Sequence, residues 1–271
     1  MPSAQPAPVM FVSHGGGPLP LLADPGHAEL CATLQTMAAA ATKPAAIVVI
    51  SAHWEEAGFH VSSHAQPSLL YDYGGFPPAA YELSYAAQGL PSLAAEVQAR
   101  LLAAGLPATL APTRGFDHGV FVPLSIMYPQ ADIPVVCVSL NSNLDPLQHV
   151  ALGGALAALL DDNVLILGSG MSFHNMHLIF DAQAAQTVNA SEGFNNWLDH
   201  TLAATSKSKQ GVDSTAEALI DWQNAPHART CHPREEHLLP LHVCYGAAQA
   251  RVERSYKLNI LGVDSRCYIW Q

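Results

Sequence analysis

Three short runs of the sequence are apolar throughout and rich in β-branched residues, which is typical of strands covered on both faces of a sheet. They span 45–52, 133–140 and 163–168. Further strands are expected at about 8–13, 58–63, 107–111 and 257–262. Stretches rich in Ala and Leu, with helical spacing of their apolar residues, lie between them. This alternation predicts an α/β fold with a central, mostly parallel sheet and helices on both faces.

Helical segments carry recognisable start and stop signals. Asp24-Pro25 and Asp145-Pro146 each place a capping carboxylate before a proline at the first helical position. Helices are also expected wherever a cap or an apolar pattern marks one, at 91–104, 146–160, 191–204 and 237–250, with a capping box at 214–217. The remaining stretches are long loops, at 14–24, 64–90, 112–131, 169–180 and 224–236. Long ordered loops in a compact domain tend to carry function.

Size and composition indicate one globular domain over residues 1–271, since the chain is 49% hydrophobic and shows neither a linker nor a repeat. No apolar stretch is long enough to span a bilayer. The first eight residues lack the basic and apolar regions of a signal peptide. The five cysteines are scattered and form no C-x-x-C pair, which indicates reduced thiols and a cytoplasmic location.

The charge balance excludes two classes of partner. With a net charge of -11 and only 11 Lys and Arg residues, the chain lacks the clustered basic face that nucleic acid or an anionic membrane surface requires. A small substrate that is uncharged or weakly acidic fits this balance better. The sequence does not set the oligomeric state.

Histidine is abundant, with 14 residues, and three of these residues stand at informative places. His14 lies in a glycine-rich turn directly after a predicted strand, and His53 directly follows the strand at 45–52. His237 stands at the start of a predicted helix. Open α/β sheets bind ligands at the carboxyl ends of their strands. Three imidazoles that converge there would form a metal site, because neutral imidazole is the commonest protein metal ligand.

Each of these histidines has a competing interpretation. The glycines after His14 would also form an anion-binding nest of backbone amides, and His53 would also serve as a satisfied histidine at a strand end. Glu236 and His232 compete with His237 as third ligand, since a carboxylate suits iron equally well.

Two further histidines, His118 and His174, lie in predicted loops. His118 is flanked by Asp117 and Gly119, and His174 follows the strand at 163–168. Imidazole has the pKa range of a general acid or base. These two residues are therefore candidates for catalysis rather than for metal binding.

Six motifs, in order along nearly the whole chain, resemble one family. They are Ser13-His14-Gly15, Val48-Val49-Ile50-Ser51-Ala52-His53-Trp54, Tyr71-Asp72-Tyr73-Gly74-Gly75-Phe76-Pro77, Gly115-Phe116-Asp117-His118-Gly119, Ser169-Gly170 with His174-Asn175, and Glu236-His237-Leu238-Leu239-Pro240-Leu241. The chain is similar to class III extradiol ring-cleavage dioxygenases of the DOPA 4,5-dioxygenase type. These enzymes belong to the superfamily of the protocatechuate 4,5-dioxygenase catalytic subunit.

The resemblance implies a mononuclear non-haem Fe(II) site at one end of the sheet, with His14, His53 and His237 as ligands. It implies His174 as the acid/base and His118 as a residue beside the substrate. The implied reaction opens a catecholic ring with O2, next to its two hydroxyls, to a semialdehyde.

The candidate residues of the substrate pocket are Tyr73, Phe76, Trp54, Arg234 and His232. Arg234 would bind a substrate carboxylate or serve as a solvated charge at a helix start. Two other functions remain open. A zinc-dependent hydrolase would use the same three histidines with Zn(II), and a metal-free small-molecule binding protein would need neither His118 nor His174.

Overall fold

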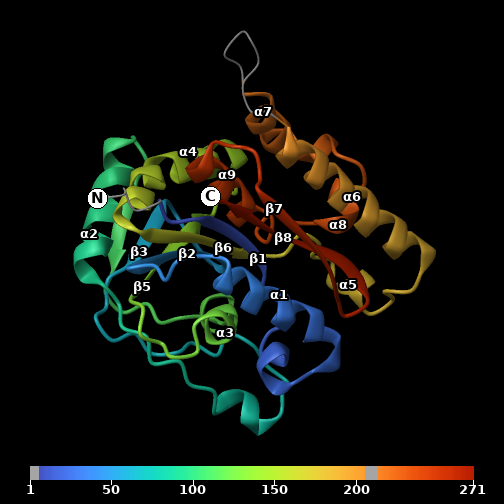
Figure 1. Cartoon of the computed structure of the whole chain (residues 1–271), viewed down its shortest axis with the longest axis horizontal. Coiled ribbons are helices and arrows are strands. Elements are labelled where there is room, and N and C mark those ends of the chain that lie inside the picture. Colours follow the sequence, from blue (N-terminus) through green and yellow to red (C-terminus); the bar gives the residue numbers. More distant parts are fainter. Residues whose placement is uncertain (1–5, 205–212) are drawn as a thin grey trace.

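The strands of the computed structural model form one eight-stranded sheet, and the structure describes residues 6–204 and 213–271 (Figure 1). The first five residues of the segment considered as a signal peptide therefore lie outside the described part. The strand order is β4-β3-β5-β2-β6-β1-β8-β7. The strands are β1 (Val9–Ser13), β2 (Ala46–Glu56), β3 (Phe59–Ser62), β4 (Ala108–Ala111), β5 (Val135–Asn141), β6 (Val164–Gly170), β7 (Arg254–Ile260) and β8 (Val263–Trp270).

The centre of the sheet is parallel, as the apolar runs predict. β5, β2, β6 and β1 pair side by side in one direction, and β3 and β4 are parallel to each other. The antiparallel pairs are β3 with β5, β1 with β8, and β7 with β8. The carboxyl ends of β2, β6 and β1 therefore lie next to one another at one edge of the sheet.

Alternating side chains of the strands form two hydrophobic cores. In β1, Val9 and Phe11 join one core and Met10 and Val12 join the other, because successive residues of a strand face opposite sides. The first core packs against α2 (Pro91–Ala103), α4 (Pro146–Leu156), α6 (Ala185–Ala203), α7 (Ser214–Ile220) and α9 (Leu239–Ala248). The second packs against α1 (Ala28–Ala39) and α3 (His118–Met127), which lie on the other side of the sheet in Figure 1.

Short helices complete the chain. They are the α-helices α5 (Met176–Ile179) and α8 (Ala228–Cys231) and the 3-10 helices η1 (Leu19–Leu22), η2 (Pro25–His27), η3 (Pro78–Tyr81), η4 (Ala157–Asp162) and η5 (Trp222–Asn224). None of the helices in the described part is both long and apolar enough to cross a membrane. The fold is thus a single α/β domain with helices on both faces of a mostly parallel sheet.

The structure corrects several predicted elements. β8 was not predicted, and α3 lies within 112–131, which was predicted to be a loop. β2 continues to Glu56, so His53 lies inside the strand rather than after it. α9 begins at Leu239, which leaves His237 in the turn before it. The side chain that caps α7 is that of Asp213, which accepts from the Ala216 amide, and not that of Ser214.

One buried histidine fixes the connection between β5 and α4. The Nδ1 of His149 donates to the carbonyl of Asp145 at 2.7 Å, and its Nε2 accepts from the amide of Asn141 at 3.3 Å. Both ring nitrogens are therefore used by the neutral form. Burial lowers the pKa of His149 to about 4.

Candidate metal centre

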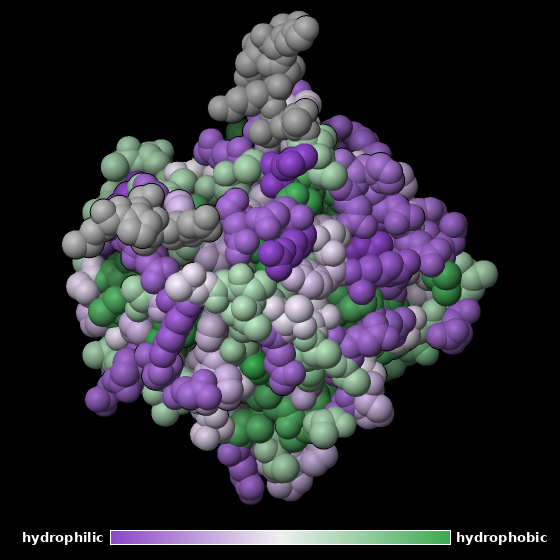
Figure 2. Space-filling model, viewed as in Figure 1, coloured by the Kyte–Doolittle hydropathy of each residue, from purple (hydrophilic) through white to green (hydrophobic). Residues whose placement is uncertain are grey.

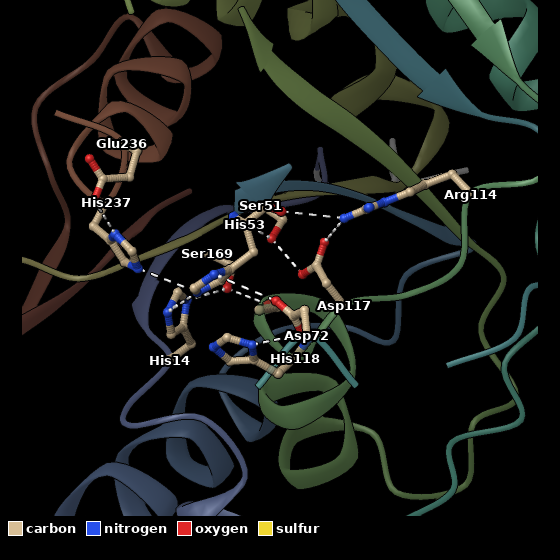
Figure 3. Close-up of polar contacts among 11 residues, drawn as sticks. His14, Ser51, His53, Asp72, Arg114, Asp117, His118, Ser169, Glu236 and His237 are labelled. Atoms are coloured by element: carbon tan, nitrogen blue, oxygen red, sulfur yellow. Dashed lines mark hydrogen bonds and ion pairs between the residues drawn. The ribbon is translucent and has the colours of Figure 1, made fainter. Parts of the chain in front are cut away.

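Three histidines from separate segments converge at the carboxyl edge of the sheet (Figure 3). His14 directly follows β1, His53 belongs to the irregular end of β2, and His237 lies in the turn before α9. The Nε2 atoms of His14 and His53 are 3.1 Å apart, and those of His53 and His237 are 3.3 Å apart. The sequence prediction that these three imidazoles meet is therefore matched by the geometry.

The opposite nitrogen of each ring faces an acceptor. Nδ1 of His14 lies 3.0 Å from the Ser169 hydroxyl, whose own proton is donated to the carbonyl of Gly119, so the hydroxyl accepts from His14. Nδ1 of His237 lies 3.0 Å from a carboxylate oxygen of Glu236.

The third ring follows the same pattern, because Nδ1 of His53 lies 3.6 Å from a carboxylate oxygen of Asp72. Hydrogen bonds favour a proton on Nδ1 of His14 and of His237, and the nearby Asp72 carboxylate favours the same tautomer of His53. Three Nε2 lone pairs are then left facing one another, with no proton between them.

This donor set fits a metal ion. Two nitrogen ligands on neighbouring positions of a metal bound at about 2.1 Å lie roughly 3.0–3.4 Å apart, as the measured spacings do. Burial, and then the proximity of the other histidines, lowers the pKa of His14 and of His53 well below its ordinary value. Burial also lowers the pKa of His237, to about 4. All three rings are thus held in the neutral form that binds metals.

Two glycines let the backbone approach closely enough to build this centre. A Cβ on Gly170, at the end of β6, would lie 2.1 Å from the carbonyl oxygen of His237. That carbonyl accepts from the amide of Met171 at 2.9 Å, which fixes the turn that carries His237. A Cβ on Gly119 would lie 2.6 Å from the hydroxyl of Ser51 and 3.1 Å from the ring of His53.

His118 lies beside the three histidines at the first residue of α3. Its ring centroid is 3.8 Å from that of His53. Both its amide and its Nδ1 lie 2.9 Å from the same carboxylate oxygen of Asp72. Burial would raise the pKa of Asp72, but the hydrogen bonds from His118 outweigh it and the pKa is lowered. Asp72 thus orients two rings, with one oxygen toward His118 and the other toward His53.

His174 lies against His237 on the other side of the centre. The two rings are stacked, with centroids 3.4 Å apart and planes inclined by 16°. Nδ1 of His174 lies 3.4 Å from the Glu236 oxygen that also accepts from His237. Burial would raise the pKa of Glu236, but these two histidines hold it well below its usual range. The carboxylate is therefore ionised and shared between both rings.

In the described part of the chain, two groups of residues each place their possible ligand atoms within 4.8 Å of one another. One group is His14, His53 and His118, and the other is His174, Glu236 and His237. His53 joins the two groups through its contact with His237.

An ion pair between Arg114 and the buried Asp117 lies next to the backbone of His53. Asp117 accepts from Arg114 at 2.7 Å and from the hydroxyl of Ser51 at 2.6 Å. Burial raises the pKa of Asp117 above its usual value. The guanidinium of Arg114 also donates to the carbonyl of His53 at 3.4 Å.

A cavity of about 380 Å3 opens onto these histidines. Of the predicted pocket residues, Tyr73 and Phe76 line it. His118 and His174 line it too, together with the three converging histidines. Most of the remaining lining is apolar: Leu19, Met171, Met176, Ile179, Phe180 and Leu261.

The other three predicted pocket residues do not line this cavity. Trp54 is buried in the hydrophobic core that packs against α1 and α3, beneath the guanidinium of Arg114, and its Nε1 donates to Glu56 at 3.1 Å. Arg234 is half exposed and pairs with Glu55 at 2.6 and 2.5 Å. His232 is fully buried near Phe194 and Trp222, and its Nε2 lies 3.1 Å from the carbonyl of Ser172.

Sequence reasoning did not single out Asp72, Ser169 or Arg114. Asp72 and Ser169 lie inside motifs that carry the family resemblance, which was the available signal. Arg114 lies outside those motifs, and only its contacts show its place. The alternative of an anion-binding glycine nest loses one donor, because the amide of Gly16 already donates to His27 at 2.9 Å.

Comparison with known proteins agrees with this geometry. The family model of the catalytic LigB subunit of aromatic ring-opening dioxygenases matches residues 10–264. The chain belongs to this family. The family resemblance inferred from the six motifs is thereby confirmed. Membership also supports an extradiol dioxygenase activity, in a family whose members use a metal.

Several known proteins are similar to this chain over most of its length. Dioxygenase tasH of Hapsidospora irregularis is 41% identical, with 97% of this chain and 85% of the relative covered. The 4,5-DOPA dioxygenase extradiol of Beta vulgaris is 40% identical over 76% of this chain and 74% of its own length. That of Escherichia coli K12 is 32% identical over 89% and 84%. The crystal structure of an uncharacterized protein from Escherichia coli K12 superposes with a TM-score of 0.76 at 27% identity, covering 98% and 100% of the two chains.

Proposed function

We propose that this protein is a non-haem Fe(II)-dependent extradiol dioxygenase that opens a catecholic ring with O2 to a semialdehyde. The observation that carries the proposal is the convergence of three histidine Nε2 atoms, with that of His53 lying 3.1 and 3.3 Å from the other two. They lie at the wall of a cavity that His118 and His174 also line. Membership of the aromatic ring-opening dioxygenase family supports ring opening among the reactions that a three-histidine centre can catalyse.

In this proposal His14, His53 and His237 hold the metal. Fe(II) bound there would supply a redox centre with positions left open to the substrate hydroxyls and to O2. Glu236 is the weaker candidate for third ligand, because its Oε1 is already used by Nδ1 of His237, on the side of the ring away from the converging Nε2 atoms. His232 is also a weaker candidate, since its Nε2 faces the carbonyl of Ser172 and its ring is buried near Phe194 and Trp222.

His174 is proposed as the acid/base. Its Nδ1 faces Glu236, so Nε2 is the nitrogen left to take a proton from a catechol hydroxyl and to return one as the ring opens. The ionised carboxylate stabilises the imidazolium that forms when the proton is taken. His118 is proposed to position the substrate, since Asp72 holds its ring through Nδ1 and leaves Nε2 toward the cavity.

The proposed setting is the cytoplasm, with a small-molecule substrate and O2 as partners. The five cysteines are scattered along the sequence without a C-x-x-C pair, which supports a reducing compartment. The net charge of -11 continues to argue against nucleic acid.

Oxygen uptake tests the proposal. The protein is loaded anaerobically with Fe(II) and mixed with O2 and a panel of catechols: catechol, protocatechuate, gallate and L-DOPA. We expect uptake of O2 with at least one catechol, in step with a yellow ring-opened product. The same protein loaded with Zn(II) serves as the redox-inert control and is expected to take up none.

Two results would overturn the proposal. One is the absence of O2 uptake across the panel while bound iron is confirmed. The other is turnover of an ester or amide by the Zn(II) form without O2, which would establish the zinc hydrolase instead.

A further inference from the structure

We infer that the substrate carries an uncharged, apolar substituent on its catechol ring, and that this substituent lies against Met176, Ile179 and Phe180. The inference rests on the proposed ring-opening function and adds the chemical class of the substrate to it. It follows from the residues that line the cavity, from the ion pairs that the nearby arginines already form, and from the exposure of the apolar side chains at the cavity mouth.

The cavity has two chemically different parts. The histidines make up one part, and the rest is formed by a glycine-rich turn, two aromatic side chains and aliphatic or thioether side chains. Among the described residues that line it, none is a Lys, Arg, Asp or Glu. A carboxylate or ammonium on the substrate would lose its hydration there without gaining a partner, which is costly.

The arginines near the centre are already paired. Arg234 binds Glu55 through both terminal nitrogens and lies 3.4 Å from Glu236. Arg114 binds Asp117 and lies over the ring of Trp54 at 4.9 Å. Neither guanidinium lines the cavity, so neither is placed to receive a substrate carboxylate.

The mouth of the cavity exposes large apolar side chains. Met176, Ile179 and Phe180 have the i, i+3, i+4 spacing of one helical face, and all three line the cavity. Met176 is 50% exposed and Phe180 is 85% exposed.

The polarity of the surface differs from region to region, and Figure 2 shows mostly hydrophilic residues over α6. An apolar group held over Met176 and Phe180 would cover surface that otherwise faces water. Because this surface continues into the cavity that reaches the histidines, the substituent of a bound catechol is the occupant that fits it.

Anaerobic calorimetry tests the inference without turnover. Catechol, 4-methylcatechol, 4-ethylcatechol, 4-propylcatechol and 4-butylcatechol are titrated into the Fe(II)-loaded protein, and protocatechuate and dopamine serve as charged analogues. We expect affinity to rise about fourfold for each added methylene. We expect protocatechuate and dopamine to bind more weakly than 4-methylcatechol.

Equal affinities along the alkyl series, or tighter binding of a charged analogue, would overturn the inference. Failure of the proposed function is recognised separately: catechol itself would then neither bind to the Fe(II) form nor support O2 uptake.

Variants locate the substituent. Phe180→Ala should reduce the gain in binding affinity for each added methylene, with the affinities expressed relative to that of catechol for the same variant. Met176→Arg should raise the affinity for protocatechuate relative to 4-methylcatechol. Leu147→Ala is the matched control, because Leu147 is a 56% exposed apolar residue on α4 that does not line the cavity. An unchanged gain per methylene in Phe180→Ala would refute the placement.

Discussion

The close approach between Gly170 and His237 makes a quantitative prediction for Gly170→Ala. The new Cβ would lie 2.1 Å from the carbonyl oxygen of His237, whereas Cβ atoms in proteins almost never come within 3.0 Å of another heavy atom. The two backbone segments must therefore separate by about 1 Å. The φ of Gly170 lies outside the left-handed region, so alanine adds this contact without a conformational penalty of its own.

A displacement of this size should act on the metal centre more than on the fold. His237 would be carried away from His53, and a misplacement of about 1 Å in a functional constellation typically costs on the order of 100-fold. We expect Fe(II) or Zn(II) affinity to fall by roughly that factor. We expect the free energy of unfolding to fall by about 1–3 kcal/mol, the usual cost of overpacking.

Two other glycines provide a graded series. Gly119→Ala places its Cβ 2.6 Å from the Ser51 hydroxyl, which can rotate away, so its loss of affinity should be smaller. Gly154→Ala on α4 is the control, because the atom nearest to its new Cβ would be the side-chain nitrogen of Gln249, at an ordinary contact distance of 3.5 Å. Zinc titration by calorimetry gives the affinities, and urea unfolding of the metal-free variants gives the stabilities. Wild-type affinity in a folded Gly170→Ala protein would refute the reasoning.

Further predictions concern the histidines and their carboxylate. His174→Ala should keep the metal but lose turnover, and His237→Ala should lose both; metal analysis beside O2 uptake distinguishes them, and full activity in His237→Ala would contradict the ligand set. Glu236→Gln should weaken Fe(II) binding by roughly 10–100-fold; unchanged binding would contradict its orienting role. Because the pKa of His149 is lowered to about 4 in the folded protein, His149 is protonated in the unfolded chain but neutral in the folded protein between pH 6.5 and about 4. Its stabilising contribution is therefore complete above pH 6.5 and is lost, by up to about 3 kcal/mol, as the pH falls to about 4. His149→Gln should show a flatter pH dependence of urea unfolding, and an unaltered slope would contradict this.

The central strands were predictable because both of their faces are buried, which leaves uninterrupted apolar runs. β8 was not, because Asp264 and Arg266 interrupt its apolar pattern. The two charges pair with each other at 2.7 Å, and Arg266 also pairs with Asp199 at 2.8 Å. α3 was not predicted because it contains Gly119 and Pro123, both poor helix formers. Burial of nearly the whole helix outweighs those propensities.

The candidate centre was predictable to a similar degree. His14 and His53 follow from the rule that parallel strands bring their carboxyl ends together. His237 was a candidate from its place at a helix start, but the choice of His237 over Glu236 and His232 required the family resemblance. The sequence could not show that Asp72 reaches both His118 and His53, because it lies in a long segment whose path depends on tertiary contacts. It also gave no sign that Trp54, one residue after His53, would be buried in the core beneath Arg114 instead of lining the cavity.

The most direct test of the metal centre is a crystal structure of the protein loaded anaerobically with Fe(II), with anomalous data collected at the iron edge. The account predicts one iron peak bonded to the Nε2 atoms of His14, His53 and His237, with Glu236 still hydrogen-bonded to Nδ1 of His237. An iron bound by His118 or by the carboxylate of Glu236 in place of His237 would contradict it.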